Sequence, residues 1–491
     1  AGSREEFPSD ALTDMEAGST SGAGYTNGAG SSEYKMLSYF ARVNYTLMDR
    51  YLLEVNMRAD ASSRFHKDHR WGYFPSFSGG WRMNEEGFMK DIEWINNLKI
   101  RASYGTLGNI NNVGNYDYFQ NYSSGNHYNF SDSPVIGIGE SKPANETLGW
   151  EKVALTDIGL DLDIFNGLLG VTADYYIKNT SDILLGYNVP TETGITAAPS
   201  QNIGKVKNTG FELALNHRNK IGAVNYSIGA NIATNKNKIT NLGGSDNIIQ
   251  TSSYIVKYIL KKGESIGSFY GFKTDGLYTQ ADIDAGHYYT LSGVVPNAGD
   301  VKFVPQRDIE YKQEITDEDR TILGKDVPDF TYGVNLSLQY KGFEFSMFGQ
   351  GISGTKVAFD VYGVHPFYHG QDNPRKYHLK RWTEENPNPY AAYPRLYSAS
   401  SVHTTYNRNF SDYHLFDSDY FRFKTLSLGY TVPSATVKSW GLQSLKVYVT
   451  GENLFTVRAD KKMEDFDPET AGGVIYTLGT KSVAFGVNIS F

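Results

Sequence analysis

The sequence predicts an all-β chain that forms a transmembrane antiparallel β-barrel. Its segments of alternating apolar and polar side chains are roughly ten residues long, which is the length that a tilted strand needs to cross a bilayer. Short and long connections alternate between these segments, as turns and loops do on the two sides of an outer-membrane barrel. The final segment, 482–491, has one apolar face and ends on an aromatic residue, Phe491.

The composition favours strands and turns over helices. The 491 residues include 50 Gly, 36 Tyr and 27 Phe, and 20% of them are charged. The sequence has no Cys, which excludes disulfides and thiolate ligands. A net charge of -8 without a basic run argues against nucleic acid as the main partner. No apolar run approaches the length of a transmembrane helix, but barrel strands need no such run.

Thirteen segments show the alternation. The first two form a hairpin around Met48-Asp49-Arg50, and an Asn166-Gly167 turn signal joins the fifth to the sixth. Lys341-Gly342 joins the clearest pair, 331–340 and 343–347. A short helix is expected at 93–95, between the third and fourth segments. In chain order, the thirteen segments are 39–47, 51–60, 73–81, 98–104, 157–163, 171–177, 211–215, 224–232, 331–340, 343–347, 426–432, 445–450 and 482–491.

The face of these strands opposite the apolar one carries charged residues, and this favours a barrel over a soluble sandwich. A sandwich also alternates, but it buries one face of each sheet and would not place ionised side chains there. A wide barrel turns that face toward a wet or plugged lumen, where charge is tolerated. The charged residues of this face are Glu54, Arg58, Lys99, Arg101, Asp157, Asp161, Asp163, Asp174 and Glu212.

Thirteen strands are too few to close a plugged transporter barrel, which has about 22. An open set would leave two unpaired edges inside the bilayer, so a partner segment with about nine further strands is expected. Residues 33–491 are then the carboxy-terminal part of a barrel, without its plug and amino-terminal strands. Residues 1–32, rich in Gly and Ser, are expected to be a flexible extracellular loop segment, and the mature protein is expected to be split there into two chains.

An ordered set of short motifs spread over almost all of residues 33–491 resembles the SusC/RagA-like TonB-dependent transporters of Bacteroidota outer membranes. The resemblance is carried by Arg70-Trp-Gly-Tyr-Phe-Pro, Leu98-Lys-Ile-Arg-Ala-Ser-Tyr-Gly, Asn145-Glu-Thr-Leu-Gly-Trp-Glu, Phe269-Tyr-Gly-Phe-Lys-Thr-Asp-Gly-Leu, Pro328-Asp-Phe-Thr-Tyr-Gly, Tyr420-Phe-Arg-Phe-Lys-Thr-Leu-Ser-Leu-Gly-Tyr and Gly451-Glu-Asn-Leu-Phe.

The resemblance implies an outer-membrane importer of large nutrients, usually glycans and sometimes peptides. It implies three partners: an amino-terminal half with a plug and remaining strands, TonB acting through that half, and a SusD-like surface lipoprotein. Membrane lipid and lipopolysaccharide would surround the barrel. A passive porin-like channel and a secreted β-rich glycan-binding protein are the alternatives. No phosphate-binding loop or nucleophile elbow is present in the sequence, and no enzymatic activity is expected.

Two kinds of candidate site lie in the long connections. In the resembling family an Asp-Gly-rich, calcium-loop-like run often precedes the Pro-Asp-Phe motif. Here residues 304–320 keep Asp317 and Asp319 but have lost the Asn-Gly-Asp-Gly core of that run. No cofactor is required, and calcium is the one possible ion. A solvated acidic loop is the alternative, as it is for a second acidic run, 460–469. The candidate calcium ligands are Asp308, Glu310, Asp317 and Asp319.

Aromatic side chains gather in two of the long connections. Such side chains stack on sugar rings or anchor a protein lid, although packing within an ordered loop also explains them. The candidate substrate-binding residues are Tyr116, Tyr118, Phe119, Tyr122, Tyr128, Phe367 and Tyr368.

Overall fold

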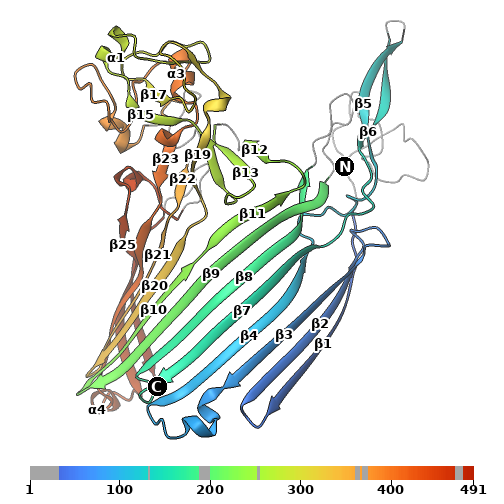
Figure 1. The fold of residues 1–491 in the computed structure, drawn as a ribbon. Helices are drawn as coiled ribbons and strands as arrows, with labels where there is room; N and C mark the ends of the chain where they lie inside the picture. The colour runs from blue at the N-terminus through green and yellow to red at the C-terminus, as the bar shows by residue number, and fades with distance from the viewer. Residues whose placement is uncertain are drawn as a thin grey trace.

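One large antiparallel sheet dominates the computed structural model and curves into an open half-barrel (Figure 1). The structure describes residues 32–130, 133–186, 200–251, 255–359, 365–367, 374–469 and 479–491, without the side chains of 123–138 and 141. Thirteen strands follow one another across the sheet, and β11 (Lys236–Leu242) pairs with β9 beside this path. The predicted number of strands is therefore confirmed, whereas the proposed loop segment 1–32 lies almost wholly outside the described residues.

The thirteen strands, which we call the wall, pair in chain order from one edge to the other. β1 and β26 stand at the two ends of the order, so the wall is open between them in the part of the chain that is described. The wall strands are β1 (Met36–Leu47), β2 (Tyr51–Ser62), β3 (Trp71–Arg82), β4 (Ile95–Asn109), β7 (Glu151–Ile164), β8 (Leu169–Gly186), β9 (Ser200–Ile221), β10 (Val224–Thr234), β20 (Phe330–Tyr340), β21 (Phe343–Ser353), β24 (Tyr420–Thr431), β25 (Ser444–Arg458) and β26 (Ser482–Ser490).

Most connections at one end of the wall are short, and we call this the turn end; the two longer ones there are 83–94 and 432–443. Met48 and Asp49 have φ of 52° and 58°, and Lys341 and Gly342 have φ of 44° and 90°. Left-handed residues of this kind give a two-residue turn the twist of the strands that it joins. The opposite end carries the long connections and is called the loop end.

The predicted helix at 93–95 is wrong. The chain makes two 3₁₀ turns earlier, η2 (Met83–Glu85) and η3 (Gly87–Met89), and Ile95 already begins β4. Trp94 instead stacks on Phe165 with ring centroids 5.7 Å apart, and its carbonyl accepts a hydrogen bond from the Phe165 amide. The contact between the β3–β4 and β7–β8 connections thus overrides the local helix preference of residues 93–95. A helix that was not predicted, α4 (Ser434–Lys438), lies between β24 and β25 after Pro433.

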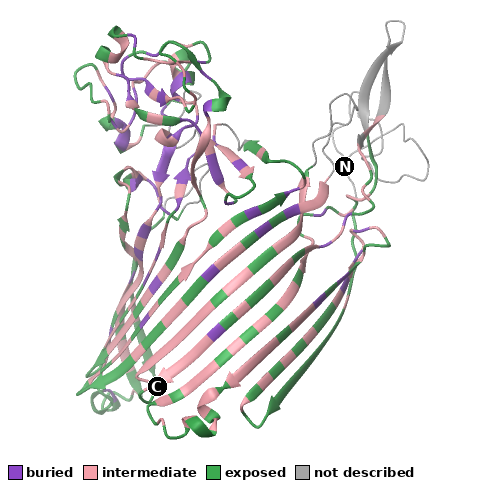
Figure 2. Cartoon of the chain, viewed as in Figure 1, coloured by how far each residue is buried: buried purple, intermediate pink, exposed green. Residues whose placement is uncertain are grey.

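The wall is apolar on its outside and polar on its inside. Large hydrophobic side chains at alternating positions stay exposed, such as Ile158 at 57% and Phe485 at 84%. Exposed and less exposed positions follow one another along the wall strands (Figure 2). That exposure suits a surface surrounded by lipid tails rather than by water. No helix among the described residues is long and apolar enough to span a membrane.

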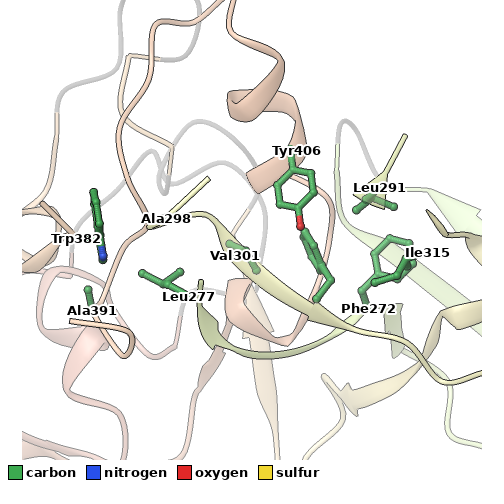
Figure 3. Packing of buried hydrophobic residues seen from close by; sticks show 10 residues of the cluster. Phe272, Leu277, Leu291, Ala298, Val301, Ile315, Trp382, Ala391 and Tyr406 are labelled. Atoms are coloured by element: carbon green, nitrogen blue, oxygen red, sulfur yellow. The ribbon is translucent and has the colours of Figure 1, made fainter. Parts of the chain in front are cut away.

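The buried apolar clusters lie mainly at the loop end, where long connections fold on one another (Figure 2). The connections between β10 and β20 and between β21 and β24 form most of this body, which we call the loop domain (residues 255–329 and 354–419, as far as described). Its main cluster packs Phe272, Val301 and Tyr406 together, each about 1% exposed or less (Figure 3). Each such side chain contributes roughly 1.5–3 kcal/mol of burial free energy, so the loop domain has a core of its own.

The remaining elements are short and connect or cap the wall. The strands are β5 (Asn121–Phe130), β6 (Ser133–Lys142), β12 (Asn247–Thr251), β13 (Lys257–Lys261), β14 (Ser268–Gly271), β15 (Lys273–Leu277), β16 (Thr290–Leu291), β17 (Val301–Val304), β18 (Glu314–Ile315), β19 (Thr321–Lys325), β22 (Lys356–Ala358) and β23 (Leu415–Asp417). The helices are α1 (Gln280–Asp284), α3 (Val402–Asn407), η5 (Asp317–Asp319), η7 (Lys376–Lys380), η8 (Asp412–His414) and η9 (Lys461–Asp465).

Candidate functional site

The inner face of the wall carries an ion-pair network across β4, β7 and β8. Arg101 on β4 donates to Asp161 at 3.1 Å and to Asp157 at 3.4 Å on β7, and to Asp174 at 2.8 Å on β8. Strand register produces this grouping, because Ser103 pairs with Asp157 and Lys99 with Asp161, while Gly159 stands between the two aspartates and opposite Asp174. The sequence prediction that these carboxylates share a face is confirmed.

Gly159 makes the network possible. A Cβ atom at this position would stand 2.4 Å from the Asp174 carboxylate and 2.5 Å from the Arg101 guanidinium. Because glycine leaves this space free, Arg101 of β4 lies flat across β7 and reaches carboxylates both on β7 and on β8 beyond it. The guanidinium fork then holds the inner surface in one arrangement.

Further ion pairs stand toward the ends of the wall. Arg58 pairs with Asp60 at 2.6 Å on β2, and Lys446 pairs with Glu344 at the turn end. The expected solvated run 460–469 is partly wrong, because Asp467 and Glu469 turn inward and bind Arg422 of β24 at 2.7 and 2.9 Å. Arg422 is only 4% exposed, so this bond fastens the connection between β25 and β26 to the wall.

Two hollows line the inner side of the wall near β1. One has a volume of about 400 Å³ and lies between Arg42, Lys99 and Asp157. The other, about 850 Å³, extends from Glu54 to Trp150 near the loop end. They share Glu54, Ser78 and Ser103 in their linings, so they form one continuous depression along the charged strands.

The structure brings together three of the predicted aromatic residues. Tyr118 and Phe119 stand 4.2 Å apart between ring centroids, and Tyr116 stands 6.5 Å from Phe119. Tyr118 packs against the buried cluster around Trp150, whereas Phe119 and Tyr122 are 50% and 63% exposed. This arrangement combines an anchored ring with exposed ones, and a role in substrate binding stays a prediction.

The other predicted aromatic residues are not grouped with these. Phe367 lies in a different connection, beside Pro366 and Tyr393, and is 51% exposed. The side chain of Tyr128 and the whole of Tyr368 lie outside what the structure describes.

The predicted calcium ligands are engaged by arginines or lie apart. Asp319 is fully buried and accepts hydrogen bonds from Arg307, and Asp317 pairs with Arg320 at 2.6 Å. Asp308 and Glu310 are exposed. Among the described residues, no three His, Asp or Glu side chains are grouped so that they could hold a metal ion. Calcium binding is therefore a prediction without structural support, and a calorimetric titration tests it.

Long-range polar contacts inside the loop domain were not predicted. The fully buried Asp300 accepts from Asn407 at 2.8 Å and contacts His403 Nδ1 at 2.7 Å, although both partners lie more than one hundred residues away along the chain. Nothing in the local sequence identifies such pairs, because single Asp, His and Asn residues in a polar connection have no periodicity.

Comparison with known proteins places this geometry in a family. The family described as TonB dependent receptor-like, beta-barrel matches residues 5–454. The chain belongs to this TonB-dependent receptor β-barrel family. It is therefore an outer-membrane protein, whose turn end faces the periplasm and whose loop end faces the outside. The location deduced from strand alternation is thus confirmed.

Curated relatives include other TonB-dependent receptors. TonB-dependent receptor P3 of Formosa agariphila is 32% identical over 431 residues, which cover 87% of this chain and 41% of that protein. TonB-dependent receptor SusC of Bacteroides thetaiotaomicron is 29% identical over 467 residues, covering 93% of this chain and 43% of that protein. The chain thus spans less than half the length of these relatives.

Among solved structures, the RagAB peptide transporter has the same receptor barrel. The match has a TM-score of 0.75 at 25% identity and covers 99% of this chain and 50% of that chain. The likeness to the SusC and RagA group that the motifs indicated is therefore confirmed.

Proposed function

We propose that this chain forms the carboxy-terminal barrel portion of a SusC-like transporter that actively imports large nutrients, glycans or peptides, across the outer membrane. The observation that carries the proposal is the match of 99% of the chain to the RagAB peptide transporter, with a TM-score of 0.75. The polar inner wall supports it, since a wall of this kind encloses a wet or plugged interior.

The proposal includes the partners that such a transporter needs. The open edges at β1 and β26 call for further strands, because unpaired backbone groups are not tolerated in lipid. The rest of the protein would supply these strands, the plug and the contact with TonB. A SusD-like surface lipoprotein would cover the loop end. The proposal has no catalytic step.

Purification from outer membranes tests the assembly. A tagged copy of this chain is extracted in mild detergent, and its companions are identified by mass spectrometry. We expect the remaining part of the transporter and one surface lipoprotein. Recovery of this chain without either companion would contradict the proposed complex.

Uptake measurements separate active import from a passive channel, the second candidate function. Cells with and without the gene are given labelled oligosaccharides or peptides of graded size. Active import requires the gene and stops when TonB is removed. Uptake that continues unchanged without TonB would instead identify a passive channel. The outer-membrane family argues against the third possibility, a secreted glycan-binding protein.

A further inference from the structure

The inner face of the wall divides into two regions of different chemistry. On β4, β7 and β8 it carries the network around Arg101. The inner face of these three strands carries three basic side chains, Lys99, Arg101 and Lys178. Against them stand five carboxylates, Glu151, Asp157, Asp161, Asp163 and Asp174, so this charged region has a formal net charge of −2. On β10 and β20 the inner face has no ionisable side chain. The inner residues there are Asn225, Ser227, Gly229, Asn231 and Ala233, and Thr331, Gly333, Asn335, Ser337 and Gln339.

The neutral region is also smooth. Asn335 lies across Gly229 on the neighbouring strand, where a Cβ atom would be 2.2 Å from its amide oxygen. Asn231 lies across Gly333 in the same way, at 2.9 Å. Each asparagine therefore lies over a glycine of the paired strand, and both lie flat instead of projecting into the lumen.

Neutral side chains prevail on the inner face of the neighbouring strands toward β26. They include the rings of Phe348 on β21 and Tyr448 on β25, and Glu452 of β25 is the charged residue among them. Ser427 on β24 and Thr450 on β25 hydrogen-bond to each other at 2.9 Å, and Ala484, Gly486 and Asn488 follow on β26. The ion pairs of this half stand at the two ends instead. Glu344 with Lys446 is near the turn end, and Arg422 with Asp467 and Glu469 is near the loop end.

The two regions suit different occupants. A charged surface with fixed ion pairs selects one partner and one register, and excess carboxylate attracts a basic partner. A solute in transit needs contacts that are weak and repeated, because strong ones would hold it. Amide and hydroxyl groups at a smooth surface give such contacts to sugars and to peptide bonds alike.

We propose that the imported molecule passes along the neutral region, over β10, β20, β21 and β24–β26. The charged region on β4, β7 and β8 then holds, through basic side chains, the part of the transporter that fills the barrel. This inference rests on the proposed function. It assigns the two occupants to different parts of the inner face of the wall. The hollows around Lys99, Asp157 and Glu54 lie on the charged side, where a packed segment would enter them.

Cysteine accessibility in the complete transporter tests the division, since this chain has no cysteine of its own. Ser337→Cys and Ser227→Cys place a thiol in the neutral region, on two residues that pair with each other. Thr172→Cys is the matched position in the charged region, where it pairs with Asp161. All three residues are fourth from the turn end of their strands, β20, β10 and β8.

Outer membranes are treated with a water-soluble maleimide, and folding of each variant is checked by its heat-dependent mobility in gels. We expect thiols at Ser337 and Ser227 to react at least about tenfold faster than the thiol at Thr172, because a thiol beneath a packed segment reacts only after local opening. We also expect a bulky maleimide at Ser337→Cys to block uptake. Equal rates, a faster reaction at Thr172, or unchanged uptake after complete labelling at Ser337 would overturn the inference.

Uptake by the unlabelled variants, measured with and without TonB, distinguishes failure of this inference from failure of the proposed function. If they import in a TonB-dependent manner and the three thiols react equally, only the division of the wall is wrong. If uptake does not depend on TonB before any labelling, the proposed function itself fails.

Discussion

Asp319 shows how one carboxylate organises a connection of the loop domain. It is fully buried and accepts from the Arg307 side chain at 2.7 and 3.1 Å. It also accepts from the backbone amides of Gln306, Arg307 and Thr316, each at 3.0 Å. Burial acts to raise its pKa, but these donors outweigh burial and lower the pKa to about 2. The residue considered as a calcium ligand thus binds protein donors on all sides.

Replacement of this carboxylate should loosen the connection. We expect Asp319→Asn to destabilise it by about 2–4 kcal/mol, because an amide cannot accept from all five donors and Arg307 loses its buried counter-ion, keeping only the exposed Glu318 at 3.2 Å. Hydrogen exchange at β17 (Val301–Val304), which precedes the connection, measures the change. Glu310→Gln is the control, since Glu310 is exposed in the same connection. Equal protection in the two variants would contradict the structural role of Asp319.

At the scale of elements, the turns decide how neighbouring wall strands meet. Gly342 ends the β20–β21 turn with φ of 90°, and its carbonyl accepts from the Thr431 amide of β24 at 2.8 Å. A Cβ atom there would stand 2.7 Å from the Thr431 carbonyl. Gly222 is the first residue of the two-residue β9–β10 turn and also has a positive φ, 59°, but a Cβ atom there would meet nothing within 4 Å.

This pair of glycines separates backbone strain from crowding. Both Gly342→Ala and Gly222→Ala should cost about 1–2 kcal/mol for a left-handed alanine. Gly342→Ala should cost more, because the turn must also move away from β24. The unfolding temperature of the purified barrel, followed by gel mobility, should therefore be lower for Gly342→Ala. An equal decrease in the two variants would show that the contact with Thr431 has no effect.

At the scale of the whole molecule, the loop domain and the wall are held together by different forces. The loop domain has apolar cores, whereas the apolar surface of the wall faces lipid. Two buried histidines, His365 and His414, lie in the loop domain with ring centroids 5.2 Å apart. Burial, aided by Lys462, lowers the pKa of His414 to about 4, and burial places the pKa of His365 well below its ordinary value.

Acid should therefore destabilise the loop domain before the wall. Above pH 6.5 His414 is neutral in both states and contributes nothing to the pH dependence. Below pH 6.5, His414 takes up a proton in the unfolded chain before it does so in the folded one. The free energy of unfolding of the loop domain therefore falls until the pH approaches the pKa of His414 in the folded protein, about 4. At pH 5 the loss from His414 is about 2 kcal/mol.

Limited proteolysis of the outer-membrane protein at pH 7 and pH 5 measures this effect. We expect faster cleavage within residues 374–417 at pH 5, while the wall keeps its heat-resistant gel mobility. His414→Gln should reduce the pH dependence, and His287→Gln, at an exposed histidine of the same domain, should leave it unchanged. The same pH dependence in His414→Gln as in the unmodified protein would contradict the assignment.

Much of the wall could be predicted because its information is local. Side chains of a strand alternate between faces with a period of two, so the sequence shows the strand and its two faces together. The pattern at 331–340 is an example, since it predicted β20 and the exposed and inner sides of that strand. The prediction failed at Trp94, where packing against Phe165 between two turns replaced the expected helix.

The sequence by itself determined the strands, their lipid-facing and inner sides, the turn and loop ends, and membership in an outer-membrane barrel family. Only the tertiary structure decided which charges meet. Arg101 binds carboxylates on two other strands, Arg422 binds Asp467 and Glu469, and Arg307 surrounds Asp319. The reason is physical: alternation is a property of neighbouring residues, whereas an ion pair depends on register and loop folding between segments distant along the chain.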